Sequence, residues 1–148
     1  MSDPVNVTSR HVSIAKFTDA AIAKIIAACE AMPAEADGSI STSILHGKAA
    51  RPNAASSFGT RKPHIMFHIN ALVEDPAQAQ TAVSWSDSVV DAIESTGESI
   101  GPTYVSFMGS EKDPKTCYGE SWDRLKAVKK DFDPEDVFKY LHGRVPVE

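Results

Sequence analysis

The segment over residues 64–73 constrains the fold of this chain more than any other. It reads HIMFHINALV, and every odd-numbered position in it is apolar. Alternation with a period of two is typical of a β-strand that is buried on one face. We therefore predict a strand over 64–73 whose odd-numbered side chains pack on helices. The other face carries the hydrogen-bonding side chains of His64, His68 and Asn70, and it is predicted to line a pocket.

Helices and further strands are predicted on both sides of this segment. A helix begins after an N-cap at Thr18 and ends at Pro33, and a second begins at Asp75 and ends near Gly97. Strands are predicted within residues 1–16, 40–48 and 103–108. The buried stripe of the first helix is predicted to consist of Ile22, Ile25, Ile26, Cys29 and Met32. This irregular order favours one α+β domain over residues 1–148, with an antiparallel sheet and helices packed on one face.

The last third of the chain is predicted to form a helix pair. Trp122, Leu125, Val128 and Phe132 recur at three- and four-residue spacing, which is the period of an apolar helix face. Asp133 is then predicted to cap a second helix, because Pro134 follows at the first helical position.

Composition and charge exclude several classes of function. The 148 residues carry a formal net charge of −5 and no basic stripe, so we expect no nucleic-acid partner. No apolar run is long enough for a transmembrane helix, and the N-terminus lacks the pattern of a signal peptide, so a cytoplasmic location is expected. Cys29 is expected in the core, and Cys117 lies near a helix start, where the pKa of a thiol can fall. His64 and His68 have no third ligand at a recognisable spacing, so no metal site is expected.

Motifs in the second two thirds of the chain resemble one enzyme family. The run from Tyr118 reads YGESWDRL and then VKKDFDPEDVF. It is similar to the C-terminal segment of berberine-bridge-enzyme-like FAD-linked oxidases. The run TYVSFMG from Thr103 resembles a strand of that family, and so does the arrangement of Phe58 and Arg61 before an apolar strand.

The resemblance implies roles for several residues. Tyr104 is the candidate catalytic residue, since the family tyrosine on this strand faces flavin and substrate and helps deprotonate a substrate hydroxyl in some members. Ser106 stands where the family usually has Asn, and it is a candidate substrate-binding residue together with His64, His68 and Asn70. Tyr140 and His142 are candidate flavin-contacting residues, although the family's asparagine-rich tail is absent here.

The family binds FAD in a separate domain with a glycine-rich loop, and no such loop occurs in this sequence. The resemblance therefore implies the substrate-side portion of a FAD-dependent oxidoreductase for a small-molecule alcohol or amine, completed by a FAD-binding domain or partner chain. A first alternative is a flavin-independent enzyme, such as a cyclase or an isomerase, that uses the polar strand face for acid–base work. A second is a small-molecule-binding or oligomerisation module that forms a homo-oligomer.

Overall fold

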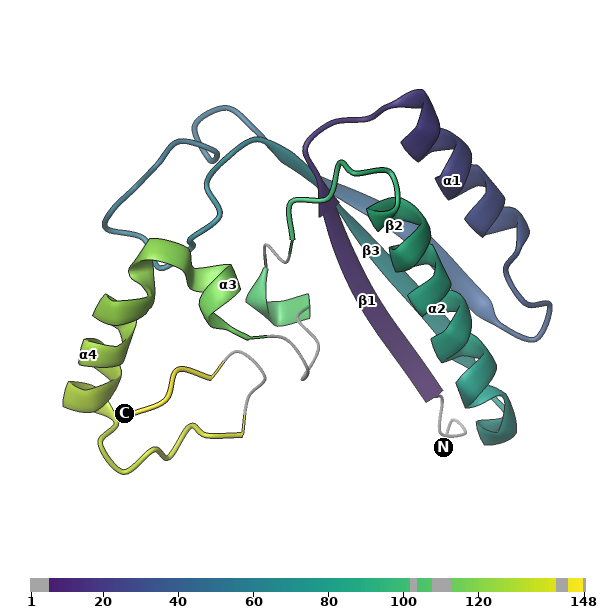
Figure 1. Ribbon diagram of the computed structural model, residues 1–148. Helices are drawn as coiled ribbons and strands as arrows, with labels where there is room; N and C mark the ends of the chain where they lie inside the picture. Colours follow the sequence, from purple (N-terminus) through teal and green to yellow (C-terminus); the bar gives the residue numbers. More distant parts are fainter. Residues whose placement is uncertain (1–5, 102–103, 108–112, 141–143, 148) are drawn as a thin grey trace. The chain divides into compact units, whose positions relative to one another are not determined.

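The computed structural model describes residues 6–101, 104–107, 113–140 and 144–147, which fall into two compact units (Figure 1). The first, called the sheet unit, comprises the described residues of 1–44 and 64–101. The second unit comprises those of 45–63 and 102–148. None of the helices in the described part of the chain is both long and apolar enough to cross a membrane.

The sheet unit is built on three strands with β3 in the centre. Strands β1 (Asn6–Ile14), β2 (Asp37–Leu45) and β3 (His64–Val73) lie in the order β1-β3-β2. Strand β1 runs antiparallel to β3, with Asn6 opposite Val73 and Ile14 opposite Ile65. The predicted bounds of the strand over 64–73 are therefore confirmed.

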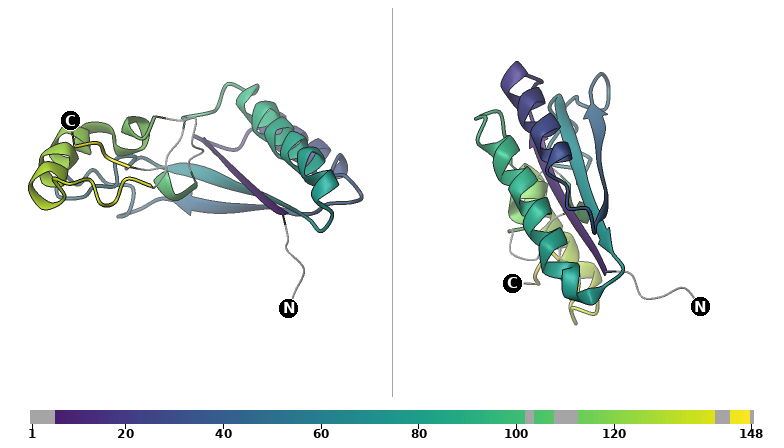
Figure 2. Two further views of the ribbon diagram at one scale, coloured as in Figure 1. Left: turned by 90° about the horizontal axis from the view of Figure 1, so that it is seen from below. Right: turned by 90° about the vertical axis from the view of Figure 1, so that its right-hand side faces the viewer.

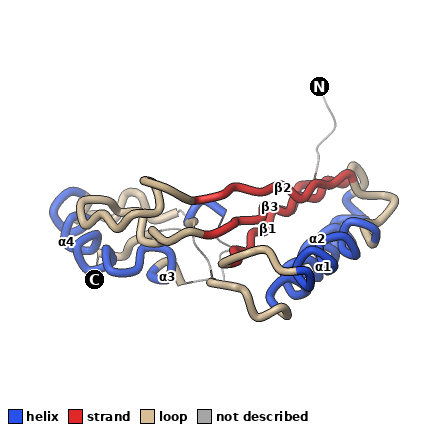
Figure 3. The backbone as a smooth tube through the Cα atoms, turned by 90° about the horizontal axis from the view of Figure 1, so that it is seen from above, coloured by secondary structure: helices blue, strands red, loops and turns tan. Residues whose placement is uncertain are grey.

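Helices cover one face of this sheet. Helix α1 (Asp19–Glu30) and helix α2 (Ala79–Glu94) lie on the same side of the three strands (Figures 2 and 3). The short 3₁₀ helix η1 (Pro76–Gln78) precedes α2. The antiparallel α+β arrangement with helices on one face, predicted from the sequence, is thus confirmed.

The core lies between the sheet and the two helices. All odd-numbered residues of β3 are buried there, and the Phe67 side chain is only 1% exposed. The indole N–H of Trp85 on α2 donates to the backbone carbonyl of Ala28 on α1, over 3.0 Å, so the two helices are joined directly. On the same face, the Arg10 guanidinium pairs with the Asp87 carboxylate at 2.7 Å.

Helices α1 and η1 each begin directly after a predicted capping residue. The Thr18 hydroxyl accepts from the Ala21 N–H over 3.2 Å, and the Asp75 carboxylate accepts from the Ala77 N–H over 2.9 Å. These bonds satisfy backbone donors that a helix start leaves unpaired. Thr18 was recognisable as a short polar side chain before a helical apolar pattern, and Asp75 as one before a proline at the first helical position.

The prediction of the buried face of α1 is wrong, because the helix turns a different set of residues toward the core. Ala21 is buried and Ile25 and Ala28 pack against the core, whereas four of the five predicted residues face outward. The exposed four are Ile22, Ile26, Cys29 and Met32. Small alanines let α1 approach the Trp85 ring closely, and this contact selects a face that helical spacing alone does not distinguish.

The second unit consists of the 45–63 loop and short helices. These are η2 (Val105–Phe107), α3 (Lys115–Tyr118), η3 (Gly119–Ser121) and α4 (Trp122–Phe132). The predicted strand over 103–108 is wrong in its described part, because residues 105–107 form a 3₁₀ turn closed by the Phe107 N–H donating to the Tyr104 carbonyl. Thr103 and Met108 lie outside the described residues. Of the apolar face predicted for α4, Trp122 and Leu125 are half-buried, whereas Val128 and above all Phe132 are exposed.

No helix follows Asp133 in the described residues, so that part of the prediction is wrong. The Asp133 carboxylate nevertheless accepts from the backbone N–H groups of Val137, at 2.8 Å, and Phe138, at 3.2 Å. It also pairs with the Lys129 ammonium, which reaches the Asp136 carboxylate at 2.8 Å. Asp136 has a φ of 53°, a left-handed conformation that a continuous helix does not accept.

The position of the core predicts that substitutions on the two faces of β3 differ strongly in their effect on the free energy of unfolding. Phe67→Ala removes a fully buried ring, and we expect it to lower the free energy of unfolding by about 3–5 kcal/mol. Leu72→Ala is the matched control on the same strand, because Leu72 is 37% exposed on the opposite face, and its cost should be about 1 kcal/mol. Urea unfolding of both variants measures the difference. Equal losses would contradict the assignment of the core face.

From the contacts of Asp133 we predict that part of the free energy of unfolding depends on pH. The pKa of Asp133 lies below its ordinary value because the Lys129 ammonium donates to the carboxylate. Burial opposes this shift, and the Val137 and Phe138 N–H groups add to it. A carboxyl with a lowered pKa stabilises the fold above its ordinary pKa of about 3.9, and this stabilisation is lost as the pH falls through the lowered value. Asp133→Asn should therefore reduce stability at about pH 7 and converge with the parent chain in acid.

Chemical denaturation at several pH values tests this expectation. Asp131→Asn is the control, since Asp131 is an exposed neighbour on α4. A loss at Asp133 that persisted unchanged in strong acid would mean that the carboxylate charge is not what stabilises the turn.

Candidate functional site

The sheet face that α1 and α2 leave uncovered carries most of the predicted binding residues. We call it the open face. Even-numbered residues of β3 lie on it, since the odd-numbered ones are in the core. His64 is buried, while His68 and Asn70 are half-buried. The structure therefore places these three predicted residues on one face of one strand.

Neighbouring strands extend the open face with residues that the sequence analysis did not single out. On β1, His11 lies directly opposite His68, and Ser9 lies directly opposite Asn70. On β2, the Ser43 hydroxyl lies 3.0 Å from His68 Nε2, within hydrogen-bonding distance. Ser43, His68 and His11 thus form a row across all three strands. His11 was identifiable only from its alternation with Val12, because cross-strand register cannot be read from a single sequence.

The open face is polar and carries few charges. The Arg10 guanidinium belongs to the covered face, where it pairs with Asp87. Among the described strand positions of the open face, the ionisable residues are His11, His64 and His68, with Asp37 at the start of β2. Imidazole is therefore the main ionisable side-chain type at these positions of the open face.

Tyr104 and Ser106 belong to the second unit. The Tyr104 ring packs against Phe107, with ring centroids 5.5 Å apart, and against Phe58, with centroids 6.4 Å apart. Ser106 is exposed within η2. The structure thus holds Tyr104 in an aromatic cluster, and its catalytic role stays a prediction.

The two residues predicted to contact flavin lie near the end of the chain. Tyr140 is 86% exposed, and the Lys139 ammonium lies 5.4 Å from the centre of its ring. His142 lies outside the described residues.

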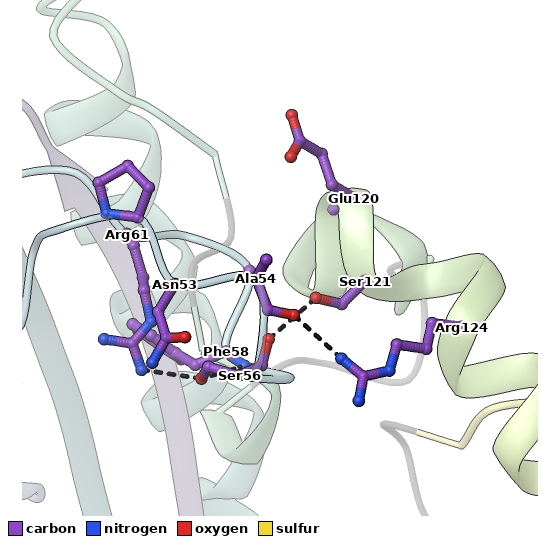
Figure 4. A pocket seen from close by; sticks show the side chains of 11 residues that line it. Asn53, Ala54, Ser56, Phe58, Arg61, Glu120, Ser121 and Arg124 are labelled. Atoms are coloured by element: carbon purple, nitrogen blue, oxygen red, sulfur yellow. Dashed lines mark hydrogen bonds between the residues drawn. The ribbon is translucent and has the colours of Figure 1, made fainter.

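A cleft of about 470 Å³ lies within the second unit (Figure 4). The Arg124 guanidinium donates to the Ala54 carbonyl over 3.0 Å, and the Ser121 hydroxyl donates to the Ser56 carbonyl over 3.0 Å. The Arg61 guanidinium donates to the Ser56 hydroxyl over 2.8 Å and lies 5.4 Å from the centre of the Phe58 ring. These side chains therefore hold the 45–63 loop against η3 and α4.

The expectation that Cys29 lies in the core is wrong, and the pKa of Cys117 is not lowered by its place near a helix start. Cys29 is exposed, and Cys117 is buried. Burial raises the pKa of the Cys117 thiol, and a hydrogen bond with Thr116 opposes this shift. Burial also raises the pKa of Tyr118, and the electrostatic interaction with its neighbour Cys117 raises it further. A nucleophilic role for Cys117 is therefore disfavoured.

The capped starts of α1 and η1 do not fit the diphosphate of FAD. A dinucleotide site needs backbone N–H groups that are free at a helix start, usually after glycines. Here Thr18 already accepts at the start of α1, and Asp75 does so before η1. No group of three or more potential metal ligands occurs among the described residues. The open face offers hydroxyl, imidazole and amide groups, which suit a small polar molecule rather than a phosphate.

The cysteine environments predict different rates of alkylation. In single-cysteine variants, the thiol at Cys29 should react with iodoacetamide on the order of tenfold faster than the thiol at Cys117 at mildly alkaline pH. The reason is that both burial and a smaller thiolate fraction slow Cys117. Mass spectrometry over time measures both rates. A faster reaction at Cys117 would show that its environment stabilises the thiolate after all.

The close approach at Gly59 predicts a stability effect in the second unit. A Cβ atom at Gly59 would lie 2.3 Å from the Tyr118 carbonyl oxygen, so the backbone would have to move. We expect Gly59→Ala to cost about 1–3 kcal/mol. Gly47→Ala is the control in the same loop, because Gly47 has a φ of 60° but open space around it, which should cost about 1 kcal/mol. A Gly59→Ala variant as stable as the parent chain would contradict this contact.

Comparisons with known proteins agree with the motifs. Residues 103–143 match the family model described as "Berberine and berberine like". The chain is 63% identical over 146 residues to the FAD-linked oxidoreductase aurO of Gibberella zeae. That alignment covers 99% of this chain but 29% of the relative, so the chain spans less than a third of the relative's length.

Solved structures share the fold at lower identity. Aclacinomycin oxidoreductase has a TM-score of 0.74 and 21% identity, covering 89% of this chain and 31% of the other. BBE-like 1 of Physcomitrella patens has a TM-score of 0.73 and 21% identity, and the match covers 95% of this chain and 31% of the other. The resemblance inferred from the motifs is thereby confirmed: in sequence and in fold, this chain is similar to one part of the berberine-bridge-enzyme-like FAD-linked oxidases.

Proposed function

We propose that this chain is the substrate-side portion of a FAD-linked oxidoreductase that acts on a small-molecule alcohol or amine. The observation that carries this proposal is the 63% identity to a FAD-linked oxidoreductase over nearly the whole chain. At this identity over one continuous stretch, the open face and the cleft-lining loop are expected to perform the same task in both proteins.

The structure supports a substrate-side role through the open face. A site for a small molecule needs a few polar groups in fixed positions beside apolar surface. Strands β1, β2 and β3 hold Ser43, His68 and Asn70 on rigid backbone, and Met66 and Leu72 add apolar surface on the same face. These groups can orient a substrate hydroxyl or amine and exchange a proton with it.

FAD would supply the two-electron chemistry, and a further portion of the polypeptide or a partner chain would hold it. The capped starts of α1 and η1 do not form a diphosphate site. The second unit also exposes large apolar side chains, with Phe132 83% and Phe138 70% exposed. Exposed apolar surface of this kind is typical of a surface that another domain covers.

The test is the visible absorption spectrum and the native mass of the protein purified from its own source. The proposal expects a yellow flavoprotein much heavier than this chain, whose flavin is bleached by substrate under anaerobic conditions. In that holoprotein, Asn70→Ala should raise KM for a hydroxylated substrate by about tenfold, because a hydrogen bond to the substrate is lost.

Exposed Thr42 of β2 provides a control variant, since Thr42→Ala removes a hydroxyl from the same strand at a position that alternates with Ser43 and so lies off the open face. A colourless species consisting of this chain alone would overturn the proposal. It would direct attention to flavin-independent acid–base chemistry on the open face.

A further inference from the structure

We infer that the cleft of the second unit is a binding site for a small organic carboxylate, with Arg124 as the side chain that contacts the carboxylate. Arg61 supplies a second positive charge, and Phe58 supplies apolar surface for the rest of the molecule. None of these residues belongs to the open face. The inference therefore goes beyond the proposed function and does not depend on it.

The loop that lines one side of the cleft is basic. Residues 45–63 include Lys48, Arg51, Arg61 and Lys62 and contain no Asp or Glu, although the whole chain has a formal net charge of −5. Arg124 of α4 adds a further cation to the lining. A concave surface with one sign of charge raises the local concentration of ligands of the opposite sign. The cleft is therefore suited to an anion, in a chain that is acidic overall.

Arg124 is held in place and still has hydrogen-bond donors to offer. Its guanidinium donates to the Ala54 carbonyl over 3.0 Å (Figure 4). A guanidinium has five N–H donors, and this bond takes up one of them. Arg124 is also exposed. Its remaining donors can therefore bind both oxygens of a carboxylate in the bidentate geometry that a guanidinium favours.

Arg61 carries a charge that no carboxylate of the described residues balances. Its guanidinium donates to the Ala49 carbonyl over 2.9 Å and to the Ser56 hydroxyl over 2.8 Å, and both acceptors are neutral. Its Nε is inaccessible and has no acceptor within the described part of the chain. A half-buried cation among neutral groups costs free energy, and a nearby anion lowers this cost. Arg61 therefore acts on the ligand mainly through its charge.

Glu120 is the acidic side chain among the described lining residues, and it does not neutralise the arginines. Figure 4 shows its carboxylate pointing away from the guanidinium groups of Arg61 and Arg124. By contrast, Arg10 and Arg144 each pair with an Asp. The ion pairs among the described residues leave both cleft arginines without a carboxylate partner. The cleft thus keeps a net positive charge for a ligand.

The size and lining of the cleft indicate an organic anion. Its volume of about 470 Å³ lies within the range of small-molecule sites, which is roughly 300–1,000 Å³. Pro52, Ala54 and Phe58 give the lining apolar surface. An inorganic anion would leave this surface in contact with water, whereas a hydrophobic body would cover it. The ligand class is thus a carboxylate joined to a compact apolar body, such as an aromatic ring.

The experiment follows 4-fluorobenzoate by fluorine NMR while the full chain is added at neutral pH. The matched neutral probe is 4-fluorobenzamide, which has the same ring and nearly the same shape but no charge. We expect the benzoate resonance to shift and broaden to saturation, with a Kd on the order of 1 mM. The benzamide should bind about tenfold more weakly, because the charge-assisted hydrogen bonds are missing. Added sodium chloride should weaken the binding of the benzoate.

Three variants locate the probe in the cleft. Arg124→Gln replaces the guanidinium with a neutral amide and should weaken binding by about tenfold. Glu120→Gln removes a nearby negative charge and should strengthen binding by about twofold, a gain that misfolding cannot produce. Lys130→Gln removes one positive charge at an exposed position of α4 outside the described lining, so it should leave Kd unchanged. Circular dichroism checks that each variant is folded.

Three results would overturn the inference: no binding of 4-fluorobenzoate, equal binding of the two probes, or binding that Arg124→Gln leaves undiminished. Displacement of the probe by an equal concentration of inorganic phosphate would also overturn it, since the cleft would then select for charge alone. The assay needs no flavin and involves no residue of the open face. Its failure would therefore leave the proposed function unaffected, and a colourless native protein would leave this inference unaffected.

Discussion

The alternation of side chains along β3 is the constraint on which the sheet unit depends. One set of alternate residues is sealed between the sheet and helices α1 and α2, and the Phe67 ring is among them. Burial of a strand on one face fixes its register, because a slip of one residue would turn every apolar side chain outward. The same constraint determines which side chains remain on the other face, so the polar character of the open face follows from the packing of the core.

Much of the sheet unit could be predicted from the sequence, because its signals are local. Alternation gave the bounds of β3. A short polar side chain before a helical apolar pattern gave the cap at Thr18, and one before a proline gave the cap at Asp75. The face of α1 could not be predicted, since helical spacing fits two adjacent stripes and only the contact with Trp85 distinguishes them. The register that brings His11 beside His68 depends on long-range pairing, which a single sequence does not reveal.

The second unit was harder to predict because its structure depends on particular polar contacts. The run after Thr103 is rich in strand-forming residues, yet its described part forms a 3₁₀ turn beside the Phe58 ring. Asp133 has the sequence signature of a helix cap, and it does accept two backbone N–H groups, but the chain turns instead of coiling. Capping chemistry was thus predicted correctly at this position while the element that follows was not. The roles of Tyr104, Ser106, Tyr140 and His142 stay predictions.

The central place of β3 has an evolutionary consequence. Phe67 and His68 are consecutive residues, so the position of the His68 ring depends on how tightly its neighbour is packed on the other side of the strand. A substitution under α1 or α2 that shifts β3 by a fraction of an ångström would also shift the row on the open face. Selection for substrate preference can therefore act through residues that never meet the substrate, and changes at core and surface positions of this strand should show epistasis.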